Sequence, residues 1–342
     1  MSDDPLGELG FIRLIREAAA RSRPGVRVGI GDDCAVLEPD AGELVLATTD
    51  LLLEDVHFRR RYAQPGDIGW KALAVNLSDI AAMGGRPRWA LVALACPLSA
   101  RAEDVRAFYT GALALADEHG VSIVGGDTSS SPAGWLVNVT LLGTSARLPL
   151  RRSTARVGDL VAVTGSLGRS RAGFALLDRA GPEPDVDATA RADVLAAHLR
   201  PRPRVKEGQW LAAAGGVTAM IDLSDGLATD LGHVARESAV GARVHVDRVP
   251  VAATARAVAA ALGEDALAWA TSGGEDYELL IACAPEALDA LADGLPRATG
   301  TPLTVVGEIV DATAGVCFVD GRGDAVRVAP GFEHFVTERG RG

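Results

Sequence analysis

The stretch that decides the fold is DIGWKALAVNLSDIAAMGG, residues 67–85. Residues 67–83 are rich in Ala, Leu and Ile, and Gly84-Gly85 closes them, which predicts one long helix with a glycine stop. Asp79 lies near the C-terminal end of this predicted helix, in apolar surroundings. The helix macrodipole is negative there and disfavours an aspartate by roughly 0.3–1 kcal/mol. Burial would add to that cost.

Two explanations of Asp79 stay open at this point. A bound cation would offset both costs, and Asn76, one turn earlier, shares the same helix face. Alternatively, Asp79 pairs with an arginine such as Arg86 or Arg88.

Other aspartates follow a common pattern along the chain. VGIGDDCAVL (28–37) places two carboxylates side by side on a tight loop, where like charges repel unless solvent or a cation relieves them. Aspartates also recur where buried strands are predicted to end, which is where α/β sheets usually assemble their sites. Aspartate also caps helices and starts turns, so each one alone has a second explanation. The residues with this placement are Asp33, Asp50, Asp127, Asp222 and Asp225.

Hard oxygen ligands without a His/Cys cluster favour Mg²⁺ over zinc. Thr48 and Thr49 add hydroxyl oxygens beside Asp50. The chain contains only two lysines, Lys71 and Lys206, and no G-x-x-x-x-G-K-[ST] phosphate loop. If this protein handles a nucleotide, divalent metal must supply much of the positive charge.

Composition limits the function further. The 342 residues predict two domains, and 48% apolar residues are ordinary for a globular protein. A net charge of −11 argues against nucleic acid as a partner. No window approaches the ~18 apolar residues of a membrane span. The acidic start MSDDPLGELG differs from a signal peptide, so a cytoplasmic location is expected. The four cysteines form no C-x-x-C pair, which excludes zinc-knuckle and thioredoxin-like sites.

The order of predicted elements indicates an α/β fold. Helices are expected over 8–20, 67–83 and 101–120, and strands over 43–50, 121–126 and 135–143. The basic, proline-containing segment 145–159 is the predicted connector, which gives domains 1–148 and 149–342. The second domain is expected to open with a strand at 159–165. Residues 165–168 then form either a phosphate-binding turn at a helix N-terminus or a plain tight turn.

Several motifs occur in a fixed order over residues 8–335: GIGDDCAVL (29–37), TTD (48–50), KALAVNLSDIAAMGG (71–85), GGDTS (125–129), DLSDGL (222–227), SGGEDYELL (272–280) and GFEHF (331–335). Through these motifs the chain resembles the thiamine-monophosphate kinase family of the aminoimidazole ribonucleotide synthetase superfamily. The resemblance implies transfer of a phosphoryl group from ATP to thiamine monophosphate, with Mg²⁺ ions bound. It also implies an N-terminal domain that forms a dimeric β-barrel-like core, and a C-terminal α/β domain that completes the substrate site.

The resemblance implies roles for individual residues. The metal ligands would be Asp33, Thr48, Thr49, Asp50, Asp79, Asp127, Asp222 and Asp225. ATP would contact Tyr109, Gly126, Asp127, Arg152 and Ser224, and the substrate would contact His57, Glu275 and Phe332. The acceptor is a phosphate that is already ionised, so the reaction needs positioning and charge neutralisation rather than a general base. The thiazolium cation of the substrate gives Glu275 and Phe332 a physical reason to lie beside it.

Alternatives and departures remain. Another ATP-using superfamily member, such as a purine-pathway cyclo-ligase, is one alternative, and a non-catalytic thiamine-phosphate or nucleotide-binding protein is another. His57 and Phe332 could also be ordinary core residues. Glu333 stands where the family usually has Asp, and Glu54-Asp55 add negative charge near His57, which would raise its pKa.

Overall fold

The computed structural model describes residues 17, 24–28 and 36–331. The helix expected over 8–20 therefore falls almost wholly outside the described residues, with only Glu17 seen as helical. The chain forms two compact units, unit 1 with residues 1–149 and unit 2 with residues 150–342. Among the described helices, none is both long enough and apolar enough to cross a membrane.

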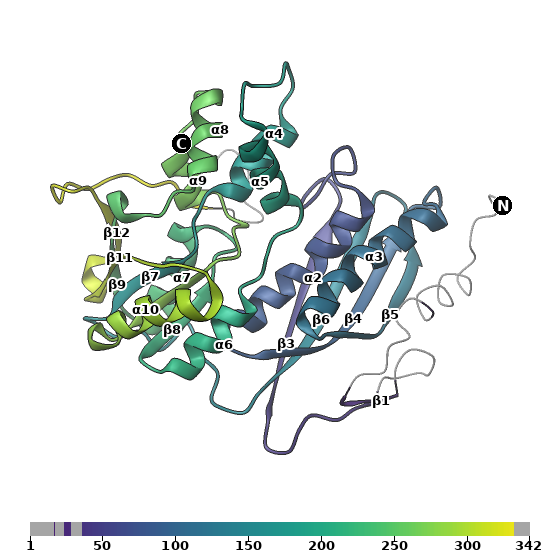
Figure 1. Cartoon of the computed structure of the whole chain (residues 1–342), viewed down its shortest axis with the longest axis horizontal. Helices are drawn as coiled ribbons and strands as arrows, with labels where there is room; N and C mark the ends of the chain where they lie inside the picture. Colours follow the sequence, from purple (N-terminus) through teal and green to yellow (C-terminus); the bar gives the residue numbers. More distant parts are fainter. Residues whose placement is uncertain (1–16, 18–23, 29–35, 332–342) are drawn as a thin grey trace. The chain divides into compact units, whose positions relative to one another are not determined.

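Unit 1 is built on a four-stranded sheet that two helices cover on one face. The strands occur in the order β3 (Leu44–Leu53), β6 (Leu136–Ser145), β4 (Arg86–Cys96) and β5 (Ser122–Ser130). Only β4 and β5 pair in parallel. Helices α2 (Pro65–Ala82) and α3 (Ala102–His119) lie side by side against this sheet (Figure 1). Two short strands, β1 (Val26–Val28) and β2 (Val36–Leu37), pair with each other separately.

Helix α2 corresponds to the predicted helix 67–83, extended by two residues at its start and one residue shorter at its end. The Asp67 carboxylate accepts a hydrogen bond from the Gln64 amide at 3.2 Å, which caps the first turn. Most of its side chains are buried, because one side of α2 contacts the sheet and another side contacts α3. The apolar run therefore reflects contacts on more than one side.

The other face of this sheet carries exposed apolar side chains. Val45, Leu51 and Leu91 are 53%, 47% and 37% exposed. Strand β3 alternates between more buried and more exposed residues, as a strand covered on one face does. In the described part of the chain the sheet is open, with β3 and β5 at its edges, and no closed barrel forms.

Unit 2 contains a six-stranded mixed sheet. Its order is β12 (Val316–Val319), β9 (Gly241–His245), β11 (Leu303–Val310), β7 (Leu160–Thr164), β10 (Leu279–Cys283) and β8 (Val217–Asp222). Strands β12 and β9 are parallel, and the other neighbours are antiparallel. All five residues of β10, which lies between β7 and β8, are buried, which explains why its sequence, LLIAC, is uniformly apolar.

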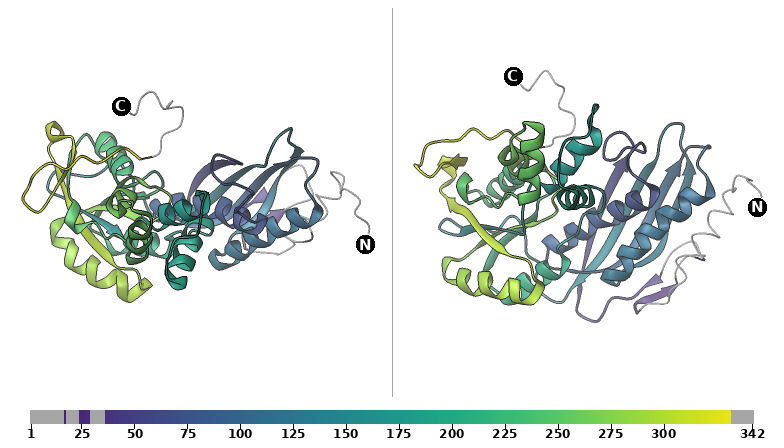
Figure 2. Two further views of the ribbon diagram at one scale, coloured as in Figure 1. Left: turned by 90° about the horizontal axis from the view of Figure 1, so that it is seen from above. Right: turned by 45° about the horizontal axis from the view of Figure 1, so that its top comes forward.

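Helices cover both sides of this sheet. Helix α7 (Leu227–Ser238) packs on one face, and α6 (Val205–Ala214) and α10 (Leu288–Thr299) pack together beside β8 and β11. A second apolar cluster joins α4 (Arg169–Asp178), α5 (Ala188–Leu199), α8 (Ala253–Leu262) and α9 (Ala266–Ser272). Figure 2 shows these helices from two further directions. Over the described residues of the unit there are also three single-turn 3-10 helices: η1 (Val246–Arg248), η2 (Pro285–Ala287) and η3 (Ala312–Ala314).

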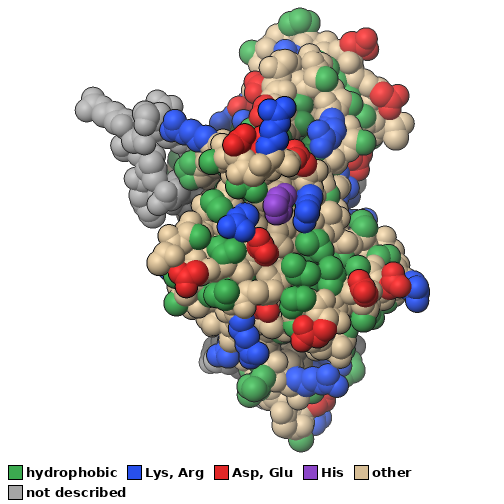
Figure 3. All heavy atoms as spheres, turned by 90° about the vertical axis from the view of Figure 1, so that its left-hand side faces the viewer, with side chains coloured by type: hydrophobic (Ala, Val, Ile, Leu, Met, Phe, Trp, Pro, Cys, Tyr) green, Lys and Arg blue, Asp and Glu red, His purple; other side chains and the backbone are tan. Residues whose placement is uncertain are grey.

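Charged side chains are mixed on the face of unit 2 that Figure 3 displays. Acidic and basic groups alternate there, with hydrophobic side chains between them. The net charge of −11 is thus not concentrated as one acidic patch on that face.

Candidate functional site

A first group of predicted ligands meets in unit 1, between β3 and α2. The Thr48 hydroxyl donates a hydrogen bond to Asp79 Oδ2, so these residues, far apart in sequence, are in contact. Asp50 lies two residues further along β3, and the Asp79 charge acts on it. The structure therefore brings together Thr48, Asp50 and Asp79 as predicted.

Burial is the main electrostatic feature of this group. Burial, and secondly the charge of Asp79, raise the pKa of Asp50 to about 7. Two carboxylates at such a place repel each other unless a cation neutralises them. Arg86 and Arg88, the arginines considered as partners for Asp79, instead make ion pairs with Asp40 at 3.3 and 3.4 Å.

Asn76 belongs to the same helix face, one turn before Asp79. It is fully buried, and its Nδ2 donates to the Ala72 carbonyl at 3.1 Å. Its Oδ1 has no hydrogen-bond partner among the described residues. An oxygen in this state is suited to a water or a cation.

Thr49 and Asp127 lie in neighbouring rows on the opposite face of the sheet from Thr48 and Asp50, so the structure does not bring them together with that group. The Thr49 hydroxyl contacts Asn138 Oδ1 and Thr140 Oγ1 at 3.3 and 3.1 Å, on the sheet face that the helices leave open. Asp127 is paired in register with Ala93, and Ala93 with Asn138. The expectation that Asp50 and Asp127 end their strands is wrong, because β3 continues to Leu53 and β5 to Ser130. Sheet pairing with β6 and β4 carries the strands past these polar residues.

Gly126, a predicted ATP contact, lies in β5 opposite Val92 of β4. A Cβ at this position would stand 1.9 Å from the Val92 carbonyl oxygen, so only glycine fits. The carboxylate of the next residue, Asp127, accepts a hydrogen bond from the Thr128 amide at 2.9 Å.

His57 and Tyr109, two further predicted contacts in unit 1, have different surroundings. His57 Nδ1 accepts a hydrogen bond from the Leu53 amide at 3.0 Å, which leaves the proton of a neutral ring on Nε2. Tyr109 is buried in α3 against Phe108, and burial raises its pKa. Glu54, expected to add charge near His57, accepts a hydrogen bond from the Trp135 amide at 2.8 Å.

A second acidic group is formed in unit 2 by the DLSDG loop and helix α7. Asp222 ends β8 and is buried, Asp225 follows in the loop, and Asp230 extends from the first turn of α7. Asp230 Oδ2 accepts hydrogen bonds from the amides of Asp225 and Gly226 at 3.1 and 3.0 Å. Burial, and then the charges of Asp222 and Asp225, raise the pKa of Asp230 to about 8.

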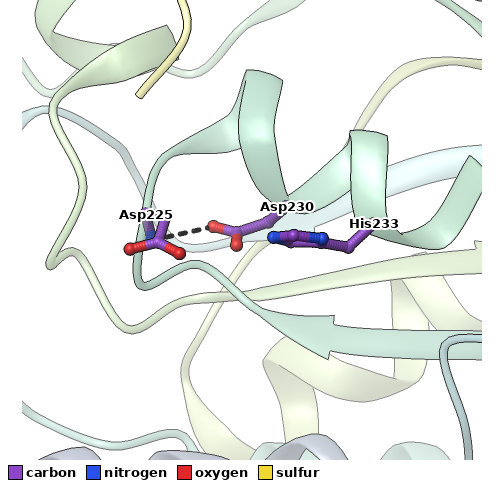
Figure 4. A group of neighbouring side chains, drawn as sticks. All are labelled: Asp225, Asp230 and His233. Carbon is purple, nitrogen blue, oxygen red and sulfur yellow. Dashed lines mark hydrogen bonds between the residues drawn. The ribbon is translucent and has the colours of Figure 1, made fainter. Parts of the chain in front are cut away.

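His233 lies one turn after Asp230 and faces the same cluster (Figure 4). One ligand atom from each of Asp225, Asp230 and His233 lies within 4.8 Å of the others. Burial, and then the guanidinium groups of Arg236 and Arg152, lower the pKa of His233. Arg152, a predicted ATP contact, is thus close to the acidic group in the folded unit. Asp230 and His233 were not predicted, although their i, i+3 spacing on an amphipathic helix after DLSDG is a usable signal.

The SGGEDYE loop is tied to the DLSDG loop by backbone hydrogen bonds. The Glu275 amide donates to the Ser224 carbonyl at 2.7 Å, and the Tyr277 amide to the Leu223 carbonyl at 2.9 Å. Glu275 and Tyr277 have left-handed backbone angles, with φ of 58° and 52°. Such values are uncommon outside glycine and concentrate at functional sites. Two predicted positions, Ser224 and Glu275, are therefore brought into direct contact.

The Asp276 carboxylate binds the backbone amides at and just after the end of the Gly165–Gly168 turn. Its carboxylate oxygens accept hydrogen bonds from the Gly168 and Ser170 amides at 2.7 and 3.2 Å, at the N-terminus of α4. The possibility that this turn binds a phosphate is not supported, because a carboxylate of the chain itself occupies the amides. Burial raises the pKa of Asp276 to about 7.

Glu278 anchors the end of the same loop in the core. This residue is fully buried, and the Arg204 guanidinium binds its two carboxylate oxygens at 2.6 and 2.5 Å. The Thr164 hydroxyl donates to it at 2.7 Å. The acidic residues of SGGEDYE therefore have different environments, and Glu278 is a structural one.

Residues 329–331 cross over the DLSDG loop. The Ser272 hydroxyl donates to the Ala329 carbonyl at 2.6 Å, and the Gly331 amide donates to Thr229 Oγ1 at 2.9 Å. A Cβ on Gly331 would stand 1.8 Å from the Asp225 carbonyl oxygen, so this close crossing requires glycine. Phe332 and Glu333, which follow, and Asp33 all lie outside the described residues.

Comparisons with known proteins find similarity over most of the chain. The profile of the AIR synthase related protein family matches residues 31–145 with its N-terminal domain and 156–320 with its C-terminal domain. The chain is 38% identical to the thiamine-monophosphate kinase of Salmonella typhimurium, over 97% of this chain and 99% of that one. The thiamine-monophosphate kinase structure from Stenotrophomonas maltophilia has a TM-score of 0.81 at 39% identity, covering 94% of this chain and 98% of that chain. The complex of AaThiL with AMPPCP and TMP has a TM-score of 0.75 at 32% identity, covering 98% and 99%.

Proposed function

The chain belongs to the AIR synthase related protein family and within it to the thiamine-monophosphate kinases, and from this membership we propose what its two acidic groups do. The protein is an ATP-dependent enzyme that phosphorylates thiamine monophosphate. The observation that carries this conclusion is the likeness over 98% of the chain to AaThiL in complex with AMPPCP and TMP.

We propose that Mg²⁺ is the metal of the reaction. In unit 1 the donor set is Thr48, Asp50 and Asp79, and in unit 2 it is Asp222 and Asp225 with Asp230 beside them. All these donors are oxygens, which suits Mg²⁺. The raised pKa values of Asp50 and Asp230, about 7 and 8, are what carboxylates built for a cation have when none is present. When bound, Mg²⁺ would neutralise phosphate charge and orient the phosphates.

The residues of the chain contribute position and charge. Thr48 and Asp79 hold each other through their hydrogen bond, so β3 and α2 present their oxygens together. Arg152, close to Asp225 and His233, supplies positive charge for a phosphate of ATP. Glu275 supplies a carboxylate for the cationic thiazolium ring, and His57 contributes to binding of the same substrate. Asp33, Thr49, Asp127, Tyr109, Gly126, Ser224 and Phe332 remain proposed contacts.

The acceptor phosphate explains why no general base is needed. A phosphate monoester already carries negative oxygen at neutral pH and can attack the γ-phosphoryl group directly, in line with the leaving ADP. Catalysis then consists of holding two anions in reach of each other. The acidic groups described above, loaded with cations, serve this purpose better than a proton acceptor would.

We propose further that the enzyme is a homodimer formed through the open face of the unit 1 sheet. Val45, Leu51 and Leu91 give this face exposed apolar area, and Thr49, Asn138 and Thr140 give it a row of polar groups. Two such sheets face to face would form the expected barrel-like core. A cytoplasmic location is part of the same proposal, and the free thiols of Cys96, Cys283 and Cys317 are compatible with a reducing compartment.

A direct assay tests the proposed activity. Purified protein is incubated with ATP, Mg²⁺ and thiamine monophosphate, and thiamine diphosphate and ADP are quantified by chromatography. Equal amounts of both products are expected, with no thiamine diphosphate when EDTA is added. Tight binding of thiamine monophosphate without turnover would instead indicate a non-catalytic binding protein. Turnover of a purine precursor in its place would indicate a cyclo-ligase.

A further inference from the structure

His198 lies directly behind the Glu275 carboxylate in unit 2. It belongs to the last turn of α5 and is only 4% exposed. Its Nδ1 is 3.3 Å from Glu275 Oε2 and 3.1 Å from the Ser170 hydroxyl oxygen. The ring also packs against Phe174, with 5.5 Å between ring centroids. No part of the sequence pattern assigns a role to this histidine.

The chemistry of these contacts determines where the ring carries its proton. An ionised carboxylate can only accept hydrogen bonds, whereas a hydroxyl can donate or accept. A bare Nδ1 would therefore place two acceptors 3.3 Å apart at Glu275. With a proton on Nδ1, this single N–H is shared between Glu275 Oε2 and the Ser170 oxygen, and the Ser170 hydroxyl acts as an acceptor. The geometry thus favours Nδ1–H while Glu275 is ionised.

Glu275 needs support of this kind because of where it lies. Its backbone is held in a left-handed conformation with φ of 58°, and its amide is bonded to the Ser224 carbonyl. Its side chain is 31% exposed, so it is accessible to a ligand and is not fixed by packing alone. A flexible three-torsion side chain loses binding strength when it must be ordered upon ligand binding. A buried hydrogen-bond donor behind the carboxylate removes part of that loss.

We propose that His198 is a positioning residue, which holds the Glu275 carboxylate ready for the cationic ring of thiamine monophosphate. The inference rests on the proposed function for its ligand, but its contacts belong to unit 2 alone. Ser170 supports the arrangement from both sides, because its amide binds Asp276 and its hydroxyl faces His198. His198 therefore acts through Glu275 and is expected not to touch the reacting phosphates.

A matched pair of substitutions tests this role. In His198→Asn the side-chain amide can occupy the place of Nδ1, whereas in His198→Gln it reaches the place of Nε2. Both variants are polar and of similar size. We expect His198→Gln to raise the KM for thiamine monophosphate about tenfold, the usual effect of losing a hydrogen bond to a charged group. His198→Asn should stay within about threefold of the wild type, and the KM for ATP and kcat should change less than about twofold in both.

A double-mutant cycle separates positioning from a merely structural role. In a Glu275→Gln background, exchange of His198 for Gln should have little further effect on KM, because the carboxylate it serves is gone. Phe174→Leu is the control for packing of the histidine ring and should leave the KM near the wild-type value. Thermal unfolding of each variant shows whether the fold is kept.

The outcomes are distinct. Equal losses in His198→Asn and His198→Gln, or additive effects of His198→Gln and Glu275→Gln, would overturn the positioning role. If the wild type makes no thiamine diphosphate, the proposed function fails. Calorimetric titration of the same variants with thiamine monophosphate then tests whether His198 contributes to binding through Glu275. The same tenfold loss of affinity is then expected in His198→Gln. Absence of binding to the wild type would overturn both.

Discussion

At the scale of single residues, similar carboxylates acquire opposite properties from their surroundings. Asp276 and Asp187 each accept two backbone hydrogen bonds at the start of a helix, α4 and α5 respectively. Burial raises the pKa of Asp276 to about 7. Asp187 is fully exposed, and the amides of Ala190 and Thr189 lower its pKa. Burial therefore decides whether the pKa of such a helix-capping aspartate is raised or lowered.

This difference predicts opposite pH dependences for two matched variants. The folded-state pKa of Asp276 lies above the unfolded value of about 3.9, so folding of the wild type is penalised progressively as pH rises from about 4 to about 7. Asp276→Asn cannot ionise. Its free energy of unfolding, relative to the wild type, should therefore improve by roughly 2–4 kcal/mol between about pH 4 and pH 8.

Asp187→Asn is the control for this measurement. The pKa of Asp187 is depressed, so its contribution to stability is present above the unfolded pKa and lost as pH falls through the folded one. The Asp187→Asn variant should therefore lose stability relative to the wild type as pH rises through about 4. Urea unfolding curves at several pH values, with EDTA present, measure both differences. A pH-independent difference for Asp276→Asn would contradict its burial as an ionisable group.

Asp79 gives a second prediction at this scale. Its contact with Thr48 and its effect on Asp50 place it at the centre of the unit 1 group. Asp79→Asn keeps the shape and one acceptor but removes the charge, so kcat should fall by about 100-fold or more while the far-UV circular dichroism is unchanged. Asp117→Asn, on the exposed side of α3, is the control and should turn over normally. Near-normal turnover of Asp79→Asn would count against a metal role.

At the scale of elements, the long helices and buried strands were predictable, because their hydrophobic pattern is strong. The sequence predicted 67–83 and 101–120 as helices, and the structure has α2 over 65–82 and α3 over 102–119. Strand β4 was not recognised, since its start, RPRW, is polar and contains a proline. Helices α5, α6 and α8 also received no prediction, because they are short and Ala-rich and are defined by packing against other helices. The chain after β10 was expected to alternate short strands and turns, which is wrong for α10.

Candidate site residues could be named from the sequence, but where they lie in their elements could not be predicted. Asp50 and Asp79 could be named because aspartates in apolar stretches are costly without a reason. That Asp50 and Asp127 lie inside strands could not be deduced, because strand length is set by pairing with β6 and β4. The contacts of His198 could not be predicted for a related reason, because its partners Ser170 and Glu275 are 28 and 77 residues away in the sequence.

The crossing of residues 329–331 over the DLSDG loop leads to a prediction about elements. Gly331→Ala would place a methyl group against the Asp225 carbonyl, so the segment must move away from the loop. We expect the KM for thiamine monophosphate to rise at least about fivefold and the free energy of unfolding to fall by about 1–3 kcal/mol. Gly232→Ala in α7 has open space around its Cβ and should stabilise the protein by up to about 1 kcal/mol. Unchanged kinetics of Gly331→Ala would show that this crossing does not support the site.

At the scale of the whole molecule, the negative net charge and the buried acidic groups have the same explanation. A protein of net charge −11 repels phosphates, and within each unit the buried carboxylates of the acidic group repel one another. Both problems have one solution if divalent cations arrive with the nucleotide. The acidic composition that argues against nucleic acid is thus compatible with an enzyme that joins phosphates.

The open face of the unit 1 sheet provides the last prediction. Three apolar side chains are exposed there, Val45 and Leu51 on β3 and Leu91 on β4, and isolated monomers rarely leave such a face uncovered. In the two-fold dimer that we propose, each substitution enters the interface twice, so Leu51→Lys places two buried charges in it. The dimer dissociation constant should rise about 100-fold or more, as measured by sedimentation velocity over a range of concentrations. Leu98→Lys is the control, because Leu98 is even more exposed, at 88%, but lies beyond the end of β4. If both variants sediment like the wild type, this face is not the dimer interface.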